Sequence, residues 1–311
     1  MAANSLRAHL VAQGTGAFND NLFRQVFTVI LLSAAADEGI GTVAIMGLCF
    51  IIPFLLLAPT AGSLAERLPN HLIMRAIRLV EPALCGIGAI AIGTGSTIAM
   101  MVTIACFGIQ SAIFSPVKYA CIPELVRPDR LEQANGLLVG ATQLAILLGI
   151  TLALVADPRF MAFAGTLVDA DLSGVSAAVP VLILSWLMCA IGIVAVFRIR
   201  PLPAFAPDHR IRPFAWSHLV GGLRVAPGLL RPGLAVSTFW TVAALLNVVA
   251  QGIGKDAFAY GHLELALLAA GFGINMTIGA IGASRITLRA FPAGMPLISV
   301  LVWPCCWAPG R

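Results

Sequence analysis

The sequence predicts an all-α polytopic membrane protein, and three observations support this fold class. Hydrophobic residues make up 59% of the 311 residues and charged residues only 11%, whereas a soluble protein carries about 25% charged residues. Long apolar stretches recur along nearly the whole chain, separated by short polar or basic connections. These stretches lack the alternation that is typical of β-barrel strands. Spanning helices are therefore expected, because lipid satisfies no exposed backbone polar groups.

Eight apolar stretches are long enough to cross a hydrocarbon core about 30 Å thick. The predicted spanning helices are 10–36, 43–61, 72–93, 97–114, 134–156, 178–197, 233–251 and 265–282. A ninth and weaker candidate lies at 293–307. No cleavable signal peptide is expected, since the first stretch is too long and no small-residue cleavage site follows it.

The charges of the connections predict the orientation of the helices. The connections after the second, fourth and sixth predicted helices are basic, whereas the alternate connections hold Arg159 and Lys255 beside several acids. By the positive-inside rule, the N-terminus and the long connection 198–232 are expected to be cytoplasmic.

The connection 198–232 divides the chain into two sets of helices. A six-helix N-terminal bundle is expected over 1–197, and a partial C-terminal bundle of two or three helices over 233–311. This layout is typical of a two-bundle transporter. The linker 198–232 is basic and rich in proline, and it is expected to be a solvated loop near anionic headgroups rather than a nucleic-acid site.

The first predicted helix carries a polar cluster near the middle of the membrane. Four polar residues interrupt its apolar sequence: Asn19, Asp20, Asn21 and Arg24. Asp20 is expected roughly 15 Å in from Leu10, a depth at which an ionisable residue usually faces a cavity or a partner. Gly14 and Gly16 precede the cluster and are expected to loosen the helix. The cluster predicts a polar, substrate-facing point.

An alternative for the same residues is a structural ion pair. Asp20 and Arg24 are spaced i, i+4 with the acid first, which is the favourable orientation for pairing. Such a pair would lock the helix against a neighbour rather than bind substrate. The two flanking amides and the preceding glycines favour the cavity interpretation.

The connection after the second predicted helix has a recognisable pattern. It reads Ala61-Gly62-Ser63-Leu64-Ala65-Glu66-Arg67-Leu68-Pro69-Asn70-His71, with Arg75 one turn further on. The pattern resembles the loop 2–3 signature of the major facilitator superfamily, which implies a cytoplasmic gate formed by Gly62, Glu66, Arg67 and Arg75. In this chain the acid is Glu rather than the usual Asp, and His71 stands where an arginine is common. Ties made by Glu66 would break and re-form as two bundles rock; the alternative is that these are ordinary loop charges.

Two further stretches narrow the family. One is Gly16-Ala17-Phe18-Asn19-Asp20-Asn21-Leu22-Phe23, and the other is Phe114-Ser115-Pro116-Val117-Lys118-Tyr119 followed by Ile122-Pro123-Glu124-Leu125 and Ala134-Asn135-Gly136-Leu137. Together they are similar to the lysophospholipid transporter branch of the superfamily. That branch includes stand-alone transporters and the membrane portion of bifunctional 2-acylglycerophosphoethanolamine acyltransferase/acyl-ACP synthetases. The resemblance covers about residues 8–285 and implies the major facilitator fold.

The resemblance also implies a function. It implies a carrier that moves lysophospholipids, notably lysophosphatidylethanolamine, from the outer to the inner leaflet of the bacterial inner membrane by alternating access, for re-acylation. The implied partners are the lysophospholipid substrate, membrane lipid and a cytosolic acyltransferase/acyl-ACP synthetase, without nucleic acid. A lysolipid suits a mostly apolar cavity with few polar groups. Asn19, Asp20 and Asn21 are the implied headgroup-facing residues.

Further site residues are weaker candidates. Asn247 stands near the point where some family members carry an arginine, and an amide can hydrogen-bond a phosphate but cannot neutralise it. Glu81, with Arg78 one turn before it, is a second substrate-facing candidate or a contact to a neighbouring helix. Lys118 and Tyr119 are expected in a short interfacial turn at the cytoplasmic membrane surface.

Enzyme activity and a cofactor are not expected. None of the five histidines is followed by Asp five residues later, and the sequence has no Gly-Lys-Ser/Thr phosphate loop and no cysteine spacing typical of metal ligands. The alternatives to a lysophospholipid transporter are a general solute or drug exporter of the superfamily and a severed membrane domain of the bifunctional protein.

The C-terminal segment departs from the family motifs. After about Ser284 prolines crowd the sequence and no further family motif follows. The family has about twelve helices and eight or nine are predicted here. We therefore expect a truncated or frame-shifted product.

Overall fold

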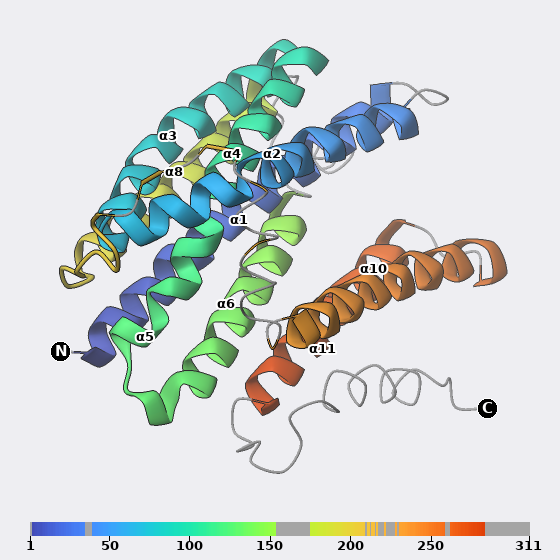
Figure 1. Cartoon of the computed structure of the whole chain (residues 1–311). Coiled ribbons are helices and arrows are strands. Elements are labelled where there is room, and N and C mark those ends of the chain that lie inside the picture. Colours follow the sequence, from blue (N-terminus) through green and yellow to red (C-terminus); the bar gives the residue numbers. More distant parts are fainter. Residues whose placement is uncertain are drawn as a thin grey trace. The chain divides into compact units, whose positions relative to one another are not determined.

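The computed structural model describes residues 2–34, 39–153, 175–258 with short gaps between 209 and 229, and 262–283. Every regular element within these ranges is a helix (Figure 1). The chain divides into two compact units, residues 1–215 and 216–311. The first unit contains α1 (Ala2–Ala34), α2 (Gly39–Arg67), α3 (Asn70–Thr94), α4 (Thr97–Ala120), α5 (Ile122–Leu125), the 3₁₀ turn η1 (Pro128–Arg130), α6 (Leu131–Leu152) and α8 (Val175–Phe197). The second contains α10 (Leu230–Phe258) and α11 (His262–Ala283).

All eight predicted helices are present, and the ninth candidate, 293–307, lies outside the described residues. Five described segments are long and apolar enough to cross a membrane: Gly41–Arg67, Asn70–Thr94, Thr97–Ala120, Pro128–Leu152 and Ala178–Phe197. The polar cluster makes α1 less apolar than these five, but α1 has 33 residues and is long enough to span a bilayer. The predicted class, an all-α polytopic membrane protein, is confirmed.

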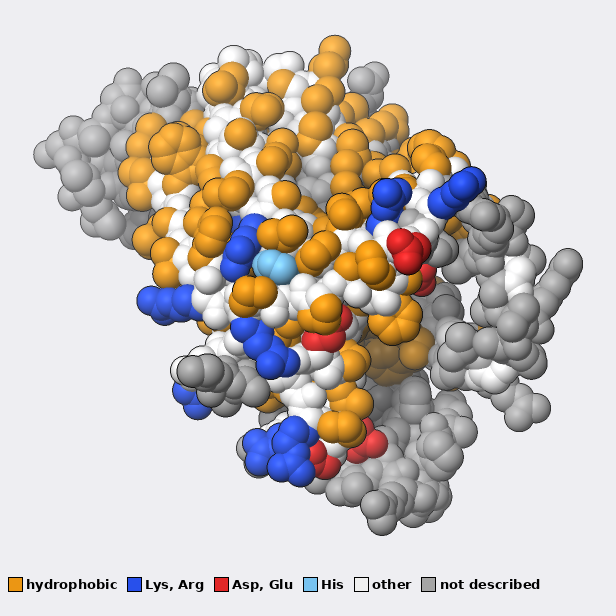
Figure 2. All heavy atoms as spheres, turned by 60° about the vertical axis from the view of Figure 1, so that its left-hand side comes forward, with side chains coloured by type: hydrophobic (Ala, Val, Ile, Leu, Met, Phe, Trp, Pro, Cys, Tyr) orange, Lys and Arg blue, Asp and Glu red, His pale blue; other side chains and the backbone are white. Residues whose placement is uncertain are grey.

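Large apolar side chains cover much of the surface of the first unit. On α2 they include five residues that are each about half exposed: Ile45, Leu48, Ile51, Leu55 and Leu56. Figure 2 shows a broad apolar area at the top of one face, with Lys and Arg side chains below it. Soluble monomers rarely expose apolar areas of this extent, whereas a bilayer solvates them.

Helix α1 is the central helix of the first unit. It contacts α2, α3, α4, α5, α6 and α8, and it runs between α6 and α8 in Figure 1. From Ala12 to Phe27 many of its apolar side chains are buried, as shown by Ala12, Phe18, Leu22 and Phe27. A helix that is buried over most of its length is expected to form the core of such a bundle.

Small residues let the other helices approach α1 closely. The Phe23 ring stacks on Phe107 of α4 with centroids 5.4 Å apart, and a Cβ at Gly88 of α3 would lie 2.5 Å from the same ring. A Cβ at Gly149 of α6 would lie 2.6 Å from the Phe18 carbonyl oxygen. These contacts explain why glycine occupies both positions.

Helix α1 is continuous through Gly14 and Gly16, so these glycines do not break the helix. It also begins at Ala2 rather than near Leu10, because its first turns pack on the unit. His9 is fully buried there, and its Nε2 atom donates to the Lys118 carbonyl oxygen at 2.9 Å.

Helix α4 ends later than predicted. The prediction stopped at 114, before Pro116, but the helix continues to Ala120. Val117 and Cys121 are buried against Met74 and Leu125, and this packing offsets the backbone hydrogen bond that proline removes. Burial raises the pKa of the Cys121 thiol to about 12, so the thiol stays neutral at physiological pH.

The first part of the predicted solvated linker is packed against the first unit. We call residues 198–208 the post-α8 segment. Ile199 and Leu202 are buried, the Leu202 N–H donates to His71 Nδ1 at 3.0 Å, and the Ala206 N–H donates to the Glu66 carbonyl oxygen at 2.8 Å. The linker is therefore not solvated at Ile199 and Leu202, whose apolar side chains are buried in the core of the first unit, while most other residues of the segment are exposed.

Replacing His71 by leucine is expected to loosen the post-α8 segment. A buried N–H without an acceptor costs about 1–3 kcal/mol, so the segment should open roughly tenfold more often. Limited trypsin digestion followed by mass spectrometry measures this as faster cleavage after the exposed Arg198. The control is His71→Asn, which keeps a side-chain acceptor and should be cleaved more slowly than His71→Leu. Equal cleavage of His71→Leu and the wild type would contradict the anchoring role.

Candidate functional site

The four polar residues of α1 face different neighbouring helices. Successive residues of a helix are rotated by about 100°, so Asn19, Asp20 and Asn21 cannot share one direction. The structure places Asn19 against α3 and α8, and Asp20 against α4. The cluster is therefore a group of separate contacts rather than one polar surface.

Asp20 lies beside Ser111 of α4. The Ser111 hydroxyl donates to Asp20 Oδ2. The second carboxylate oxygen, Oδ1, is buried and has no hydrogen-bond partner among the described residues. A buried carboxylate oxygen without a donor is costly, and a carboxylate of this kind can accept a hydrogen bond from a cationic or hydroxyl group.

Arg24 does not form the ion pair with Asp20 that the i, i+4 spacing allowed. Its Nη2 atom donates to Asn21 Oδ1, and its guanidinium lies 5.2 Å from the Phe50 ring centroid of α2. Asn21 in turn donates to the Ala17 carbonyl oxygen at 2.7 Å. The alternative of a locking Asp20–Arg24 pair is wrong for the described structure, since Arg24 satisfies its donors on the neighbouring amide and the aromatic ring.

Asn19 belongs to a buried network that includes Glu81 and Arg78 of α3. Asn19 Nδ2 donates to Glu81 Oε1 at 2.9 Å, to the Ser185 carbonyl oxygen at 3.4 Å and to Cys189 Sγ at 3.3 Å. Arg78 forms an ion pair with Glu81 Oε2. Both charged side chains are buried, with exposed fractions of 3% for Arg78 and 0% for Glu81.

Two other residues hold the Arg78 guanidinium in place. It lies 5.1 Å from the Phe114 ring centroid, and a Cβ at Gly16 would come within 2.2 Å of its Nη2 atom. Any side chain at position 16 would therefore displace the Arg78 guanidinium from its present position. Of the two roles left open for Glu81, the network favours a contact between neighbouring helices.

The residues of the predicted gate are spread around one end of the unit. Arg75 Nη2 donates to the Ile199 carbonyl oxygen at 3.4 Å, and its guanidinium lies 4.9 Å from the Phe197 ring centroid. Glu66 and Arg67 are exposed in the last turn of α2. A Cβ at Gly62 would meet nothing within 4 Å. Within the first unit, Arg75 therefore ties α3 to the end of α8.

Lys118 and Tyr119 lie in the last turn of α4 rather than in a separate turn. The Lys118 ammonium is 5.2 Å from the Tyr119 ring centroid, and Tyr119 is exposed. Asn247 is a residue of α10 in the second unit, and its side chain lies outside the described residues.

Glu124 lies where α5 meets the post-α8 segment. Arg200 donates to the Glu124 carbonyl oxygen. Burial raises the pKa of the Glu124 carboxyl, while a hydrogen bond from Asn70 and the Arg200 charge oppose the rise. Glu124 belongs to the motif that follows α4, and the structure uses it to hold α3, α5 and the post-α8 segment together.

Ser111 and Arg78 were not predicted as site residues. Arg78 had a detectable signal, since an arginine three residues before a glutamate within an apolar helix indicates a buried pair. The sequence did not indicate Ser111 as a site residue, because a single serine in an apolar helix commonly hydrogen-bonds the backbone of its own helix.

The fold and these residues define a polytopic helical membrane protein whose central helix carries a partly buried carboxylate. No protein-family model matches the chain. Comparison with curated proteins finds the lysophospholipid transporter LplT of Photorhabdus laumondii, which is 30% identical over 208 residues, or 67% of this chain and 46% of that protein. LplT of Cronobacter sakazakii is 30% identical over 147 residues, or 47% of this chain and 35% of that protein.

A longer alignment is found with LplT of Yersinia pestis, which is 28% identical over 322 aligned positions, covering 97% of this chain and 70% of that protein. In the first two alignments the chain spans less than half of the relative's length. The chain is thus a relative of proteins named lysophospholipid transporter LplT, and the resemblance predicted from the motifs is confirmed. The alignment over 97% of the chain also continues past Ser284, so the expected limit of the resemblance near 285 is corrected.

Proposed function

We propose that this chain acts in the transport of lysophospholipids of the lysophosphatidylethanolamine class by a major facilitator mechanism. The observation that carries the proposal is the similarity to proteins named lysophospholipid transporter, which extends over 97% of the chain in one case. The substrate would move from the outer to the inner leaflet of the bacterial inner membrane, where a cytosolic acyltransferase/acyl-ACP synthetase would re-acylate it.

The proposed architecture follows the charge pattern of the sequence. Residues 1–197 form the six-helix N-terminal bundle, 198–232 the cytoplasmic linker, and 233–311 part of the C-terminal bundle. The N-terminus is cytoplasmic, since the basic connections lie on that side. The chain would work by alternating access, as other transporters of this layout do.

Asp20 is the proposed headgroup ligand. Its Oδ1 atom is buried without a partner among the described residues, and an ethanolamine ammonium is a donor that would satisfy it. Ser111 would keep the carboxylate oriented through the hydrogen bond to Oδ2. The large apolar content of the helices suits the acyl chain.

The other predicted site residues have supporting roles in this proposal. Asn19 and Glu81 hold α1 against α3, Asn21 accepts a hydrogen bond from Arg24, and Arg24 packs on Phe50 of α2. Asn247 of the second unit is proposed as a further hydrogen-bonding ligand of the substrate. Gly62, Glu66, Arg67 and Arg75 would form the cytoplasmic gate, and Lys118 and Tyr119 would anchor the end of α4 at the membrane surface.

A leaflet-resolved uptake assay tests the proposal. The purified chain is reconstituted into phosphatidylcholine vesicles, fluorescent lysophosphatidylethanolamine is added to the outer leaflet, and albumin extraction measures the fraction that has become inaccessible. We expect faster loss of extractable lipid than in protein-free vesicles. The same vesicles are tested with a soluble fluorescent cation. Movement of the cation without movement of any lysophospholipid would overturn the proposal and favour a general exporter.

A further inference from the structure

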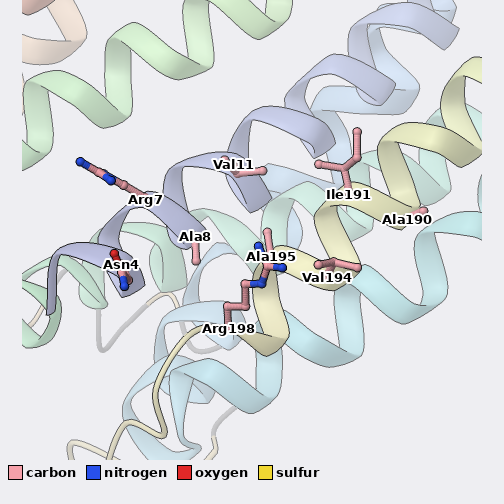
Figure 3. Close-up of a pocket in the computed structure, with 9 residues that line it drawn as sticks. All are labelled: Asn4, Arg7, Ala8, Val11, Ala190, Ile191, Val194, Ala195 and Arg198. Atoms are coloured by element: carbon pink, nitrogen blue, oxygen red, sulfur yellow. The ribbon is translucent and has the colours of Figure 1, made fainter. Parts of the chain in front are cut away.

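A groove lies between the N-terminal turns of α1 and the C-terminal turns of α8, away from Asp20 (Figure 3). Its volume is about 660 Å³, which is within the range of about 300–1,000 Å³ that is typical of ligand sites. Two helical stripes line it. On α1 the stripe contains Asn4, Arg7, Ala8 and Val11; on α8 it contains Ala190, Ile191, Val194 and Ala195, and Arg198 continues it just after the helix ends.

The spacing of both stripes explains why these side chains share a groove. Residues three, four and seven positions apart lie on one face of a helix, and each stripe covers about two turns. Figure 3 shows the Val11 and Ile191 side chains pointing toward one another across the groove. Val11, Ile191 and Val194 are each about half exposed, so the apolar walls of the groove are open.

The polar residues of the groove are gathered at one end of it. Asn4 and Arg7 lie in the first turns of α1, and Arg198 directly follows the last residue of α8. All three are exposed. In Figure 3, Arg198 extends along α8 beside Ala195, and Arg7 extends outward from α1. Neither arginine has an acidic partner within 4 Å among the described residues.

The groove is distinct from the Asp20 site. Val11 and Asp20 are nine positions apart, which is roughly 13 Å along a helix. The two also face different helices, since Asp20 contacts α4 whereas the groove lies between α1 and α8.

We propose that this groove binds one anionic phospholipid of the surrounding bilayer as a resident ligand. The lipid phosphate would lie between Arg7 and Arg198, with the Asn4 amide as a further donor, and an acyl chain would lie along Val11, Ile191 and Val194. The occupant is inferred from the charge and the shape of the groove. The groove has two arginines without acidic partners at one end and apolar walls along the rest of its length. These features are complementary to a phospholipid whose anionic headgroup lies at the membrane surface and whose acyl chain lies in the bilayer.

Native mass spectrometry of the purified full chain in detergent tests the proposal. The chain is titrated with phosphatidylglycerol and, separately, with phosphatidylcholine of the same acyl chains. We expect tighter binding of phosphatidylglycerol, and Arg7→Gln and Arg198→Gln should each weaken it about fivefold. The matched control is Arg130→Gln, an exposed arginine of η1 outside the groove, which should change binding by less than about twofold.

A second variant tests the apolar part of the groove. Val194→Trp fills the groove from an exposed position, and it should weaken the binding of both phospholipids. Equal affinity for the two phospholipids, or an equal loss in Arg130→Gln, would overturn the proposal. Displacement of phosphatidylglycerol by glycerol 3-phosphate at equal concentration would also overturn it, since the site would then bind a free anion without an acyl chain.

Discussion

Asp20→Asn is expected to reduce lysophosphatidylethanolamine uptake about tenfold or more in the leaflet-resolved assay, because a hydrogen bond to a charged group is worth about 1.5–3 kcal/mol. The substitution keeps the shape of the side chain and the acceptor for the Ser111 hydroxyl. It removes only the negative charge that would pair with the headgroup ammonium. The loss should therefore appear in transport and not in the amount of folded protein.

The matched control for Asp20→Asn is Asp129→Asn. Asp129 of η1 is exposed and paired with Arg127 at 3.2 Å, so the same chemical change is made outside the site. Uptake by Asp129→Asn should equal that of the wild type. Normal uptake by Asp20→Asn would contradict the proposed role of the carboxylate, even if the chain transports lysophospholipids.

Glu81→Gln is expected to destabilise the first unit by about 3–5 kcal/mol, because it leaves the Arg78 charge buried without its partner. The cost is large because α3 cannot expose Arg78 without separating from α1, where Gly16 lies against the guanidinium. The free energy of unfolding, measured by titration with sodium dodecyl sulfate in mixed micelles, checks the prediction.

Two further variants test whether the instability of Glu81→Gln comes from breaking the buried ion pair or from the loss of any carboxylate charge. Asp129→Asn breaks an exposed pair, with exposed fractions of 83% and 60%, and should cost less than about 1 kcal/mol. Arg78→Met combined with Glu81→Leu removes both buried charges and should recover most of the stability lost in Glu81→Gln. In the double variant Asn19 keeps the Ser185 carbonyl and Cys189 as acceptors. A double variant as unstable as Glu81→Gln would show that the buried pair is not the origin of the loss.

The helices were predictable from the sequence because each spanning segment is a continuous apolar run. Their ends were less predictable where polar residues are buried by neighbouring elements. His9 and the turn after Pro116 are examples, since each is held by contacts between segments distant in the sequence. The post-α8 segment shows the same limit, because its arginines indicate a solvated loop while Ile199 and Leu202 decide its position.

The candidate site was predictable as a set of residues but not as an arrangement. The sequence places Asn19, Asp20 and Asn21 together, and only the packing of α3, α4 and α8 around α1 determines which neighbour each side chain meets. The i, i+4 spacing of Asp20 and Arg24 allowed a pair that the structure does not form, because Arg24 reaches Asn21 and the Phe50 ring instead.

The central position of α1 has a consequence for biosynthesis. It is the first of the described helices to be synthesised, and membrane helices pack after they have been inserted. Each later helix of the first unit can therefore pack against α1, which is already inserted in the bilayer. Substitutions in α1 should for this reason impair assembly of the nascent chain more than equal changes in α8, which is the last described helix of the first unit to be synthesised and contacts fewer helices.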